Sequence, residues 1–293
     1  MPGVSDKQYF DLYDLMKNFI GSDDPGKMMQ AGVDEMINTF PVHKVSVPVD
    51  ANVVMQNKTV NANDTIVSEV RFDIPKNILM KNDLALLNII AGNKWKRPIY
   101  FTSLFDELGF ASYLRKDGLT YRFVPVTGSE VNTEWMADKL MNKFGFGGAN
   151  IRGVYFDDEN RRQLNIIRST YAELAFHLAV NGRKDEARKY LYKADKMMLQ
   201  DNFPYGHISR GNMHNRYSLA FLEACYHADA KDLAAKVIQS VKSDLTQQIK
   251  FYNSLDGNKA EWVAFDKKNA EELLLTMDGM KFMFEKQRTM KIE

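Results

Sequence analysis

The sequence predicts an α+β fold, in which a small α/β layer with a βαβ unit is followed by an α-helical, tetratricopeptide-like repeat region. Two patterns predict this division. Short apolar alternations typical of strands occupy the first part, and apolar residues spaced by three and four dominate from about residue 133 onward. A chain of 293 residues is also long enough for two modest hydrophobic cores. We therefore expect an α/β domain at 1–130 and a helical domain at 131–293.

The first element is expected to be a helix over residues 6–20, where apolar side chains recur at helical spacing. Ser5 or Asp6 would cap its N-terminus, because both side chains accept hydrogen bonds from the free amides of a first turn. The glycine- and proline-containing run 21–26 would end it.

The strand segments come next. Residues 45–49 alternate, and Pro48 places this strand toward the edge of a sheet because proline donates no backbone hydrogen bond. A strand at 66–74, a helix at about 81–92 and a strand at 98–102 form the predicted βαβ unit, with two parallel strands and a right-handed crossover. Gly92 would end its helix.

A further strand at 119–125 completes the predicted α/β layer. Beyond it, two helical hairpins are expected at 164–194 and 217–245. Equivalent positions in the two hairpins lie further apart than the ~34-residue tetratricopeptide period, so the pair is interpreted as a degenerate repeat with a long inserted loop. A last helix at about 267–288 carries a broad apolar face, which would cap the repeats or meet a partner.

The composition limits the functions that the chain can have. Its 39 Lys and Arg residues balance 38 Asp and Glu residues, for a formal net charge of +1, so no nucleic-acid partner is expected. No run approaches the ~20 apolar residues that span a bilayer, and the N-terminus lacks the basic and apolar regions of a signal peptide. On these grounds alone the chain would stay in the cytoplasm.

No residue pattern predicts catalysis, a metal site or a cofactor. The five histidines lack the i, i+4 spacing of a helical zinc site, and His207 and His214 are assigned surface or capping roles. The acidic run 157–159 fits a helix N-terminus. The glycine-rich segment 144–150 lacks the Gly-Lys-Ser/Thr ending of a phosphate loop and is interpreted as a flexible junction. The lone Cys225 lies in an apolar helical pattern.

A basic and aromatic block stands out at residues 94–97. Trp95 could stack on a sugar ring, and Lys96 and Arg97 could bind a phosphate or carboxylate, so we predict these three residues as substrate-binding. The alternative is structural: Trp95 fills the core, and the cations interact with the carbonyls at the end of the preceding helix. The sequence leaves both interpretations open.

One position is a candidate for modification. The tripeptide Asp64-Thr65-Ile66 resembles the acceptor motif of a bacterial periplasmic O-glycosylation system. It lies at a predicted loop–strand boundary, where an enzyme could reach it. Thr65 is therefore a predicted glycosylation site.

Three motif segments carry a wider resemblance. They are Phe72-Asp73-Ile74-Pro75-Lys76, the block Asn93-Lys94-Trp95-Lys96-Arg97-Pro98-Ile99-Tyr100-Phe101, and a G-L-x-Y-R-x-V-P pattern at residues 118–125. Together, over roughly residues 40–130, they resemble the C-terminal soluble region of a bacterial family of multi-spanning, protein O-mannosyltransferase-like membrane proteins, whose members carry a domain of unknown function.

The resemblance implies an extracytoplasmic accessory domain at the periplasmic face of the inner membrane. The membrane helices would lie in segments absent from this chain, and sugar transfer would take place in that missing part of a glycosyltransferase-like parent. The chain itself is then expected to be non-catalytic, with a glycan or an acceptor polypeptide as its partner, positioned for the parent.

Two other functions remain open at this stage. In the first, the helical hairpins form a protein–protein interaction scaffold that binds a peptide on a concave face with Tyr192, Tyr205 and Tyr217. In the second, the chain is a self-contained carbohydrate-active enzyme, with Trp95 and its neighbours opposing carboxylates such as Asp157 or Asp158 in a site between the domains.

Overall fold

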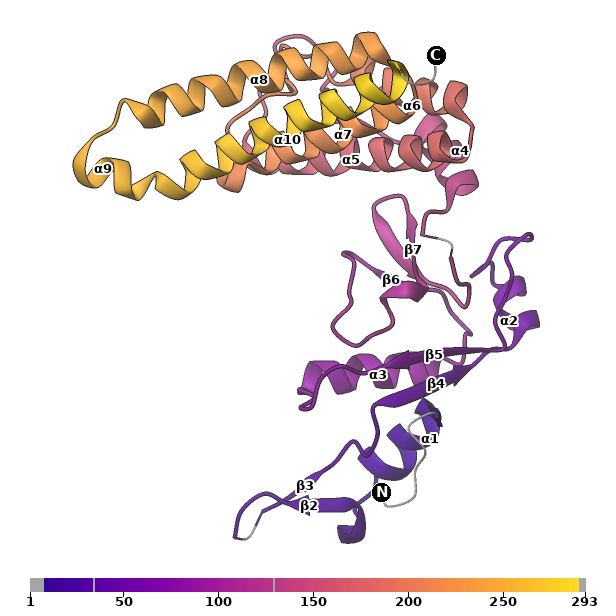
Figure 1. The fold of residues 1–293 in the computed structure, drawn as a ribbon. Helices are drawn as coiled ribbons and strands as arrows, with labels where there is room; N and C mark the ends of the chain where they lie inside the picture. Colours follow the sequence, from indigo (N-terminus) through magenta and orange to yellow (C-terminus); the bar gives the residue numbers. More distant parts are fainter. Residues whose placement is uncertain (1–7, 34, 129, 290–293) are drawn as a thin grey trace. The chain divides into compact units, whose positions relative to one another are not determined.

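The computed structural model describes residues 8–33, 35–128 and 130–289, and the chain divides into two compact units, Met1–Asn132 and Thr133–Glu293. We call them unit 1 and unit 2. Strands and helices mix in unit 1, whereas the described part of unit 2 is helical (Figure 1). The predicted α+β class is therefore confirmed. Residues 5 and 6, the predicted caps of the first helix, lie outside the described residues.

Unit 1 contains two three-stranded sheets and a separate hairpin. The first sheet has the order β1-β4-β5, with β1 parallel and β5 antiparallel to β4. The second is antiparallel throughout, with the order β6-β8-β7. The strands are β1 (Phe10–Asp11), β2 (Met28–Gln30), β3 (Met36–Asn38), β4 (Lys44–Pro48), β5 (Glu69–Asp73), β6 (Ile99–Phe101), β7 (Leu114–Asp117) and β8 (Thr120–Phe123), of which β2 and β3 form the hairpin.

The predicted βαβ unit is wrong. Its two strands, β5 and β6, belong to different sheets, and α3 (Lys81–Asn93) connects the sheets. The physical reason lies just after α3, where Lys94 and Trp95 both adopt left-handed backbone conformations with φ of 44° and 59°. The chain turns there toward β8 instead of returning beside β5. Gly92 does not end the helix, since it lies inside α3 and Lys94 takes the left-handed capping position.

Two further expectations at the start of the chain are corrected. The first helical segment begins later than predicted, with α1 (Leu12–Leu15) continued by a π-helical turn at Met16–Ile20, and Asp11 is its cap. The strand that contains Pro48 is the central one of its sheet, not an edge. This is tolerated because β1 pairs with β4 only at Val45 and Ser46, so no strand on that side requires an amide from Pro48.

The core of unit 1 centres on Phe110. Its ring lies 5.5–5.7 Å from four other rings, and the loop that carries it passes close to β5. Gly109 makes this approach possible, because a Cβ atom there would lie 2.0 Å from the carbonyl oxygen of Asp73 and the backbone has φ of 86°. The surrounding rings are those of Phe72, Phe101, Phe105 and Phe123.

Unit 2 is built from helical hairpins that share a core. Helix α5 packs against both α6 and α7, and α8 packs against α7 and α10. The two predicted hairpins correspond to α5–α6 and α7–α8, while their description as tetratricopeptide-like repeats stays a prediction. The helices are α4 (Thr133–Asn142), α5 (Asp158–Val180), α6 (Lys184–Met197), α7 (Met213–His227), α8 (Lys231–Asn253), α9 (Gly257–Trp262) and α10 (Ala264–Thr289).

The glycine-rich segment is part of the packed structure of unit 2, which corrects its interpretation as a flexible junction. Phe146 is buried, and its ring lies 5.7 Å from the ring of Tyr171 on α5. The side-chain amide of Asn202 donates to the carbonyl oxygens of Ala149 and Ile151 at 3.1 and 2.6 Å. These contacts fasten the segment to the loop after α6.

A buried arginine organises that loop, which connects α6 to α7. Arg168 on α5 donates to the carbonyl oxygens of Phe203 at 2.8 Å and Pro204 at 3.3 Å. Its guanidinium also lies over the rings of Phe203 and Tyr205, at 4.2 and 4.6 Å from their centroids. Because these carbonyls and ring faces solvate the cation, it can remain buried inside the helical unit.

His214 on α7 joins the same network in its neutral form. Its Nε2 lies 2.7 Å from the carbonyl oxygen of Pro204, an acceptor, so this nitrogen carries the proton. Its Nδ1 lies 3.2 Å from the Asn165 side-chain amide and accepts from it. Burial, and secondly the charge of Arg168, lower the pKa of His214 to about 3. The assigned surface or capping role of His214 is therefore wrong.

Acidification is expected to destabilise unit 2 between pH 6.5 and about 3. In the unfolded chain the pKa of this histidine is near its ordinary value of 6.5. In this window the unfolded chain therefore binds a proton at His214, whereas the folded chain does not. Each pH unit then removes up to about 1.4 kcal/mol of unfolding free energy, and stability is regained as the pH rises to 6.5. Urea unfolding followed by circular dichroism at several pH values measures this slope.

The His214→Gln variant is the control for this prediction. Glutamine keeps a donor for the Pro204 carbonyl but does not titrate, so the variant should show a shallower loss of stability over the same pH range. Equal slopes in the two proteins would contradict the assignment to His214.

Candidate functional site

Unit 1 contains a pocket of about 520 Å³ beside Trp95. Its wall is assembled from four places in the chain: the β1–α1 junction, the end of β4, the start of α2 (Ala51–Gln56) and the turn after α3. This volume lies within the range of about 300–1,000 Å³ that is typical of small-molecule sites. The lining residues are Asp11, Tyr13, Asp14, Val47, Pro48, Val49, Asp50, Val53, Ala91, Lys94, Trp95 and Lys96.

Trp95 fixes the rear of this pocket. Its indole is only 4% exposed and stacks on Phe123, with ring centroids 5.1 Å apart and planes 7° from parallel. Its Nε1–H donates to the carbonyl oxygen of Pro48 at 2.8 Å. The indole is thus a wall held on one face and at its nitrogen.

The turn that carries Trp95 is closed by an asparagine. The Asn93 side chain accepts from the backbone amide of Arg97 at 3.2 Å and donates to the carbonyl oxygen of Arg97 at 2.6 Å. From the other side, the Asn57 side chain donates to the Trp95 carbonyl oxygen at 2.5 Å. These bonds hold two consecutive left-handed residues in place, a conformation that costs energy for non-glycine residues.

Charged groups of both signs surround the mouth of the pocket. Asp11 and Asp50 cap α1 and α2, accepting from backbone amides at 2.9–3.3 Å, and the capping bonds fix the orientation of both carboxylates. Asp14 adds an exposed third carboxylate. Two lysines also line the pocket: Lys96, and Lys94, whose ammonium lies 3.9 Å from the centroid of the Tyr13 ring.

This arrangement suits a neutral, polyhydroxylated ligand. Carboxylates accept hydrogen bonds from hydroxyl groups, whereas the ammonium and phenol groups donate them. Between these groups lie the apolar side chains of Val47, Val49 and Val53, which fit the C–H faces of such a ligand. The pocket brings together donors, acceptors and apolar walls, but no pair of groups arranged as a nucleophile and its base.

The structure separates the three predicted substrate-binding residues. Trp95 and Lys96 line the pocket. Arg97 is exposed and not among the lining residues; its backbone is used in the turn. Sequence reasoning missed the acidic side, because Asp11, Asp14 and Asp50 are far from residue 95 in the chain and each also fits an ordinary helix start.

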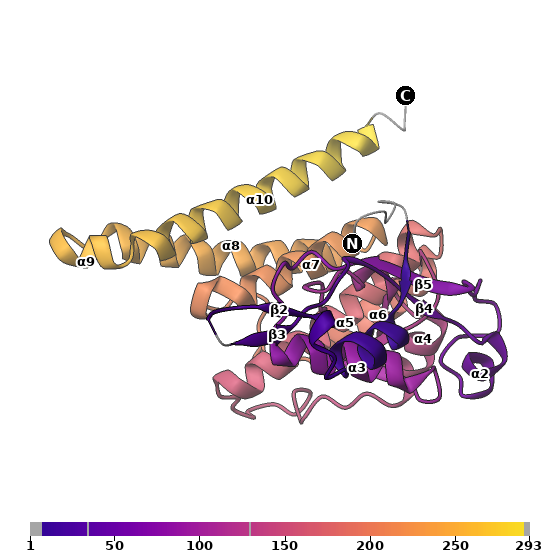
Figure 2. The same ribbon diagram turned by 90° about the horizontal axis from the view of Figure 1, so that it is seen from below.

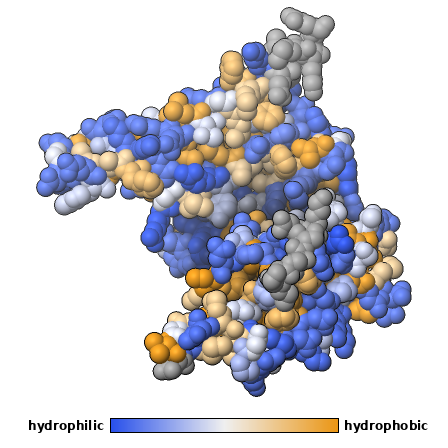
Figure 3. Space-filling model, turned by 60° about the horizontal axis from the view of Figure 1, so that its bottom comes forward, coloured by the Kyte–Doolittle hydropathy of each residue, from blue (hydrophilic) through white to orange (hydrophobic). Residues whose placement is uncertain are grey.

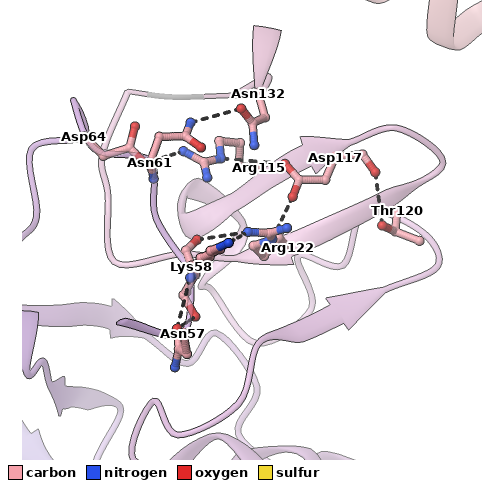
Figure 4. Close-up of polar contacts among 10 residues, drawn as sticks. Asn57, Lys58, Asn61, Asp64, Arg115, Asp117, Thr120, Arg122 and Asn132 are labelled. Carbon is pink, nitrogen blue, oxygen red and sulfur yellow. Dashed lines mark hydrogen bonds and ion pairs between the residues drawn. The ribbon is translucent and has the colours of Figure 1, made fainter. Parts of the chain in front are cut away.

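A second polar feature of unit 1 is a buried cluster of ion pairs, shown in Figure 4. Asp64 pairs with Arg115 at 2.6 Å, and Asp117 pairs with Arg122 at 2.6 Å. Arg115 and Asp117 also approach each other to 3.8 Å, so two positive and two negative groups form one neutral network. Arg115 is fully buried.

This cluster attaches the 57–64 loop to the second sheet. Arg122 on β8 donates to the carbonyl oxygen of Lys58 at 2.6 Å, and the Asn61 side chain donates to Asn132 Oδ1 at 3.0 Å (Figure 4). Thr65 follows this loop and is exposed, but the neighbouring Asp64 carboxylate is engaged by Arg115. Glycosylation of Thr65 stays a prediction.

The other candidate residues lie in unit 2. Asp157 caps α5 and accepts from the amide of Asn160 at 2.8 Å, and Asp158 lies in the first turn. The Arg162 guanidinium lowers the pKa of Glu159 to about 2. Across the described part of the chain, no group of three or more His, Cys, Asp and Glu residues is arranged to hold a metal ion.

Comparison with known proteins adds one finding. Residues 3–141 match the family model of TMEM260-associated domain 2. The match contains the whole pocket and all three motif segments, and it links this region to a domain family associated with a membrane protein. No curated protein and no solved structure matches the chain. The link to a membrane protein was part of the expected resemblance; the O-mannosyltransferase-like assignment stays a prediction.

None of the helices over the described residues combines the length and apolar character that crossing a bilayer requires.

Replacing Trp95 is expected to destabilise unit 1. Trp95→Ala removes a buried ring and leaves a cavity, at a cost of about 3–5 kcal/mol. Trp95→Phe keeps an aromatic ring against Phe123 but leaves the Pro48 carbonyl without its donor, at a cost of about 1–3 kcal/mol. Urea unfolding followed by circular dichroism measures both. Trp262→Phe, at an exposed position, is the matched control and should change stability by less than about 0.5 kcal/mol.

The ion cluster of Figure 4 gives a second stability prediction. Asp117→Asn leaves Arg115 and Arg122 facing each other in a buried site with only one carboxylate, and should cost about 3–5 kcal/mol. Asp106→Asn removes an exposed carboxylate from the same unit and should cost less than about 0.5 kcal/mol. Similar melting temperatures for the two variants would show that the cluster is not important for stability.

Proposed function

We propose that this chain is an accessory region of a membrane-bound, glycosyltransferase-like protein, in which unit 1 binds a glycan in the pocket beside Trp95. It would lie outside the cytoplasm, at the periplasmic face of the inner membrane, and would not catalyse sugar transfer alone. The observation that carries this proposal is the pocket itself, with its carboxylates, lysines and valine walls, inside the TMEM260-associated domain 2 match.

The chemistry of the pocket supports a carbohydrate over a nucleotide or a phosphorylated ligand. Three carboxylates and two lysines give the lining a negative balance, which disfavours multiply charged anions. Carboxylate oxygens are good acceptors for the paired hydroxyls of a sugar ring. Within this proposal Trp95 forms the wall and Lys96 donates to the ligand, whereas Arg97 contributes through its backbone to the turn that holds Trp95.

A second candidate function concerns unit 2. A polar groove of about 440 Å³ runs along α8 beside the loop that Arg168 holds, and its amide and hydroxyl groups could bond the backbone of an acceptor polypeptide. Such a groove is consistent with the scaffold hypothesis. The groove does not use Tyr205, which is buried and whose hydroxyl donates to Asp195 at 2.9 Å. Its lining is Gln200, Pro204, Gly206, Lys236, Gln239, Ser240, Ser243, Asp244 and Gln247.

Isothermal titration of the chain with mannose-containing oligosaccharides tests the glycan proposal. We expect saturable binding that weakens by about tenfold or more in Asp14→Asn and in Lys96→Ala, since each change removes a charged hydrogen-bonding group from the pocket. Asp23→Asn and Lys81→Ala are matched controls at exposed positions outside the pocket and should bind as the parent does.

Peptides that contain Asp-Thr serve as the second ligand class in the same experiment. Peptide binding that survives both pocket variants and is lost in Ser240→Ala or Gln247→Ala would favour the scaffold function of unit 2. The absence of saturable glycan binding would refute the proposed role of the pocket.

A further inference from the structure

The α8–α10 hairpin of unit 2 ends in a cluster of exposed aromatic side chains. Figures 1 and 2 both show this end, with α9, extending beyond the helices α5 and α7 of the same unit. Phe251 lies near the end of α8, Trp262 ends α9, and Phe265 lies in the first turn of α10. Their side chains are 57%, 77% and 75% exposed. We call residues 250–268 the hairpin tip.

Packing within unit 2 does not explain these aromatic residues. In this part of α8 and α10 other side chains, among them Tyr252 and Ala270, are the buried ones. Single exposed apolar residues are common on protein surfaces, but three large exposed aromatic side chains within one short, protruding segment are typical of an interaction site.

The hairpin tip has a net positive charge, because it contains four lysines and three carboxylates. Lys250 and Lys259 are exposed beside the aromatic residues. Long lysine side chains can lie along an apolar surface while their ammonium groups reach a polar layer above it. In Figure 3 the same hairpin shows hydrophobic residues among hydrophilic ones.

We propose that the hairpin tip docks onto the surface of a phospholipid bilayer. Tryptophan and phenylalanine insert at the boundary between head groups and acyl chains, where one end of the indole ring is apolar and the other can hydrogen-bond. The lysines would contact the phosphates of anionic head groups. The docking is peripheral, and it is independent of the glycan pocket, which lies in unit 1.

A bilayer fits the hairpin tip better than a second copy of the chain does. A stable protein–protein interface buries about 1,600 Å² in total and needs an extended complementary surface, whereas this patch consists of three side chains at the end of a projecting hairpin. Residues 3–141 match a domain family linked to a membrane protein, and a bilayer partner is compatible with this link.

Co-sedimentation of the chain with phospholipid vesicles tests the proposal. Vesicles of phosphatidylcholine and phosphatidylglycerol in equal amounts should bind the chain, and Trp262→Ser with Phe265→Ser should lower the partition coefficient by about tenfold or more. Lys250→Glu with Lys259→Glu should weaken binding to these vesicles at low salt but have little effect with pure phosphatidylcholine. All four positions are exposed, so the variants should remain folded, which circular dichroism checks.

Unit 1 supplies a matched control for exposed apolar surface. Val33 and Ile78 are 89% and 77% exposed. Among the described residues, neither of them belongs to a group of exposed aromatic side chains like that of the hairpin tip. Val33→Ser with Ile78→Ser should leave vesicle binding unchanged. The proposal would be overturned if vesicle binding were lost in this control but kept in the tip variants. It would also be overturned if the chain did not bind vesicles, or if it self-associated through Trp262.

Discussion

The hydrogen bond from the indole of Trp95 to the carbonyl oxygen of Pro48 is the contact on which the architecture of unit 1 depends. It joins the last residue of β4 to the turn after α3, while one face of the indole stacks on Phe123 of β8. One side chain thus connects the first sheet, the helix and the second sheet. The two left-handed residues that deliver it are unfavourable in isolation, and the packed ring and its hydrogen bond offset that cost.

The ion cluster around Arg115 and Asp117 contributes specificity of a different kind. Burying four charged groups costs desolvation free energy. A neutral network with short ion pairs offsets this cost only when all its members are present. The members come from the 57–64 loop and from two neighbouring strands. The cluster therefore favours one position of the loop against the sheet, because any shift would leave a buried charge without its partner.

The sequence identified most of the helices, because amphipathic spacing reports local preference. It did not identify the pairing of the strands. β6 is only three residues long, so its sequence is compatible with several strand partners. The left-handed turn at Lys94 and Trp95 contains no glycine, the residue from which such a turn is usually predicted. Likewise, Trp95 and Lys96 stood out as a motif, whereas the carboxylates that face them come from residues 11, 14 and 50. Only the fold brings these groups together.

Two very short helices of unit 1, α1 and α2, contribute residues to the wall of the pocket. α1 has four residues and α2 has six, lengths at which a helix in water does not persist without tertiary support. Their capping aspartates are the same groups that would hold a ligand. Occupancy and local order are therefore thermodynamically linked: a molecule that bridges these helix starts would protect their amides from hydrogen exchange, and the empty pocket would be a place where the unit opens first.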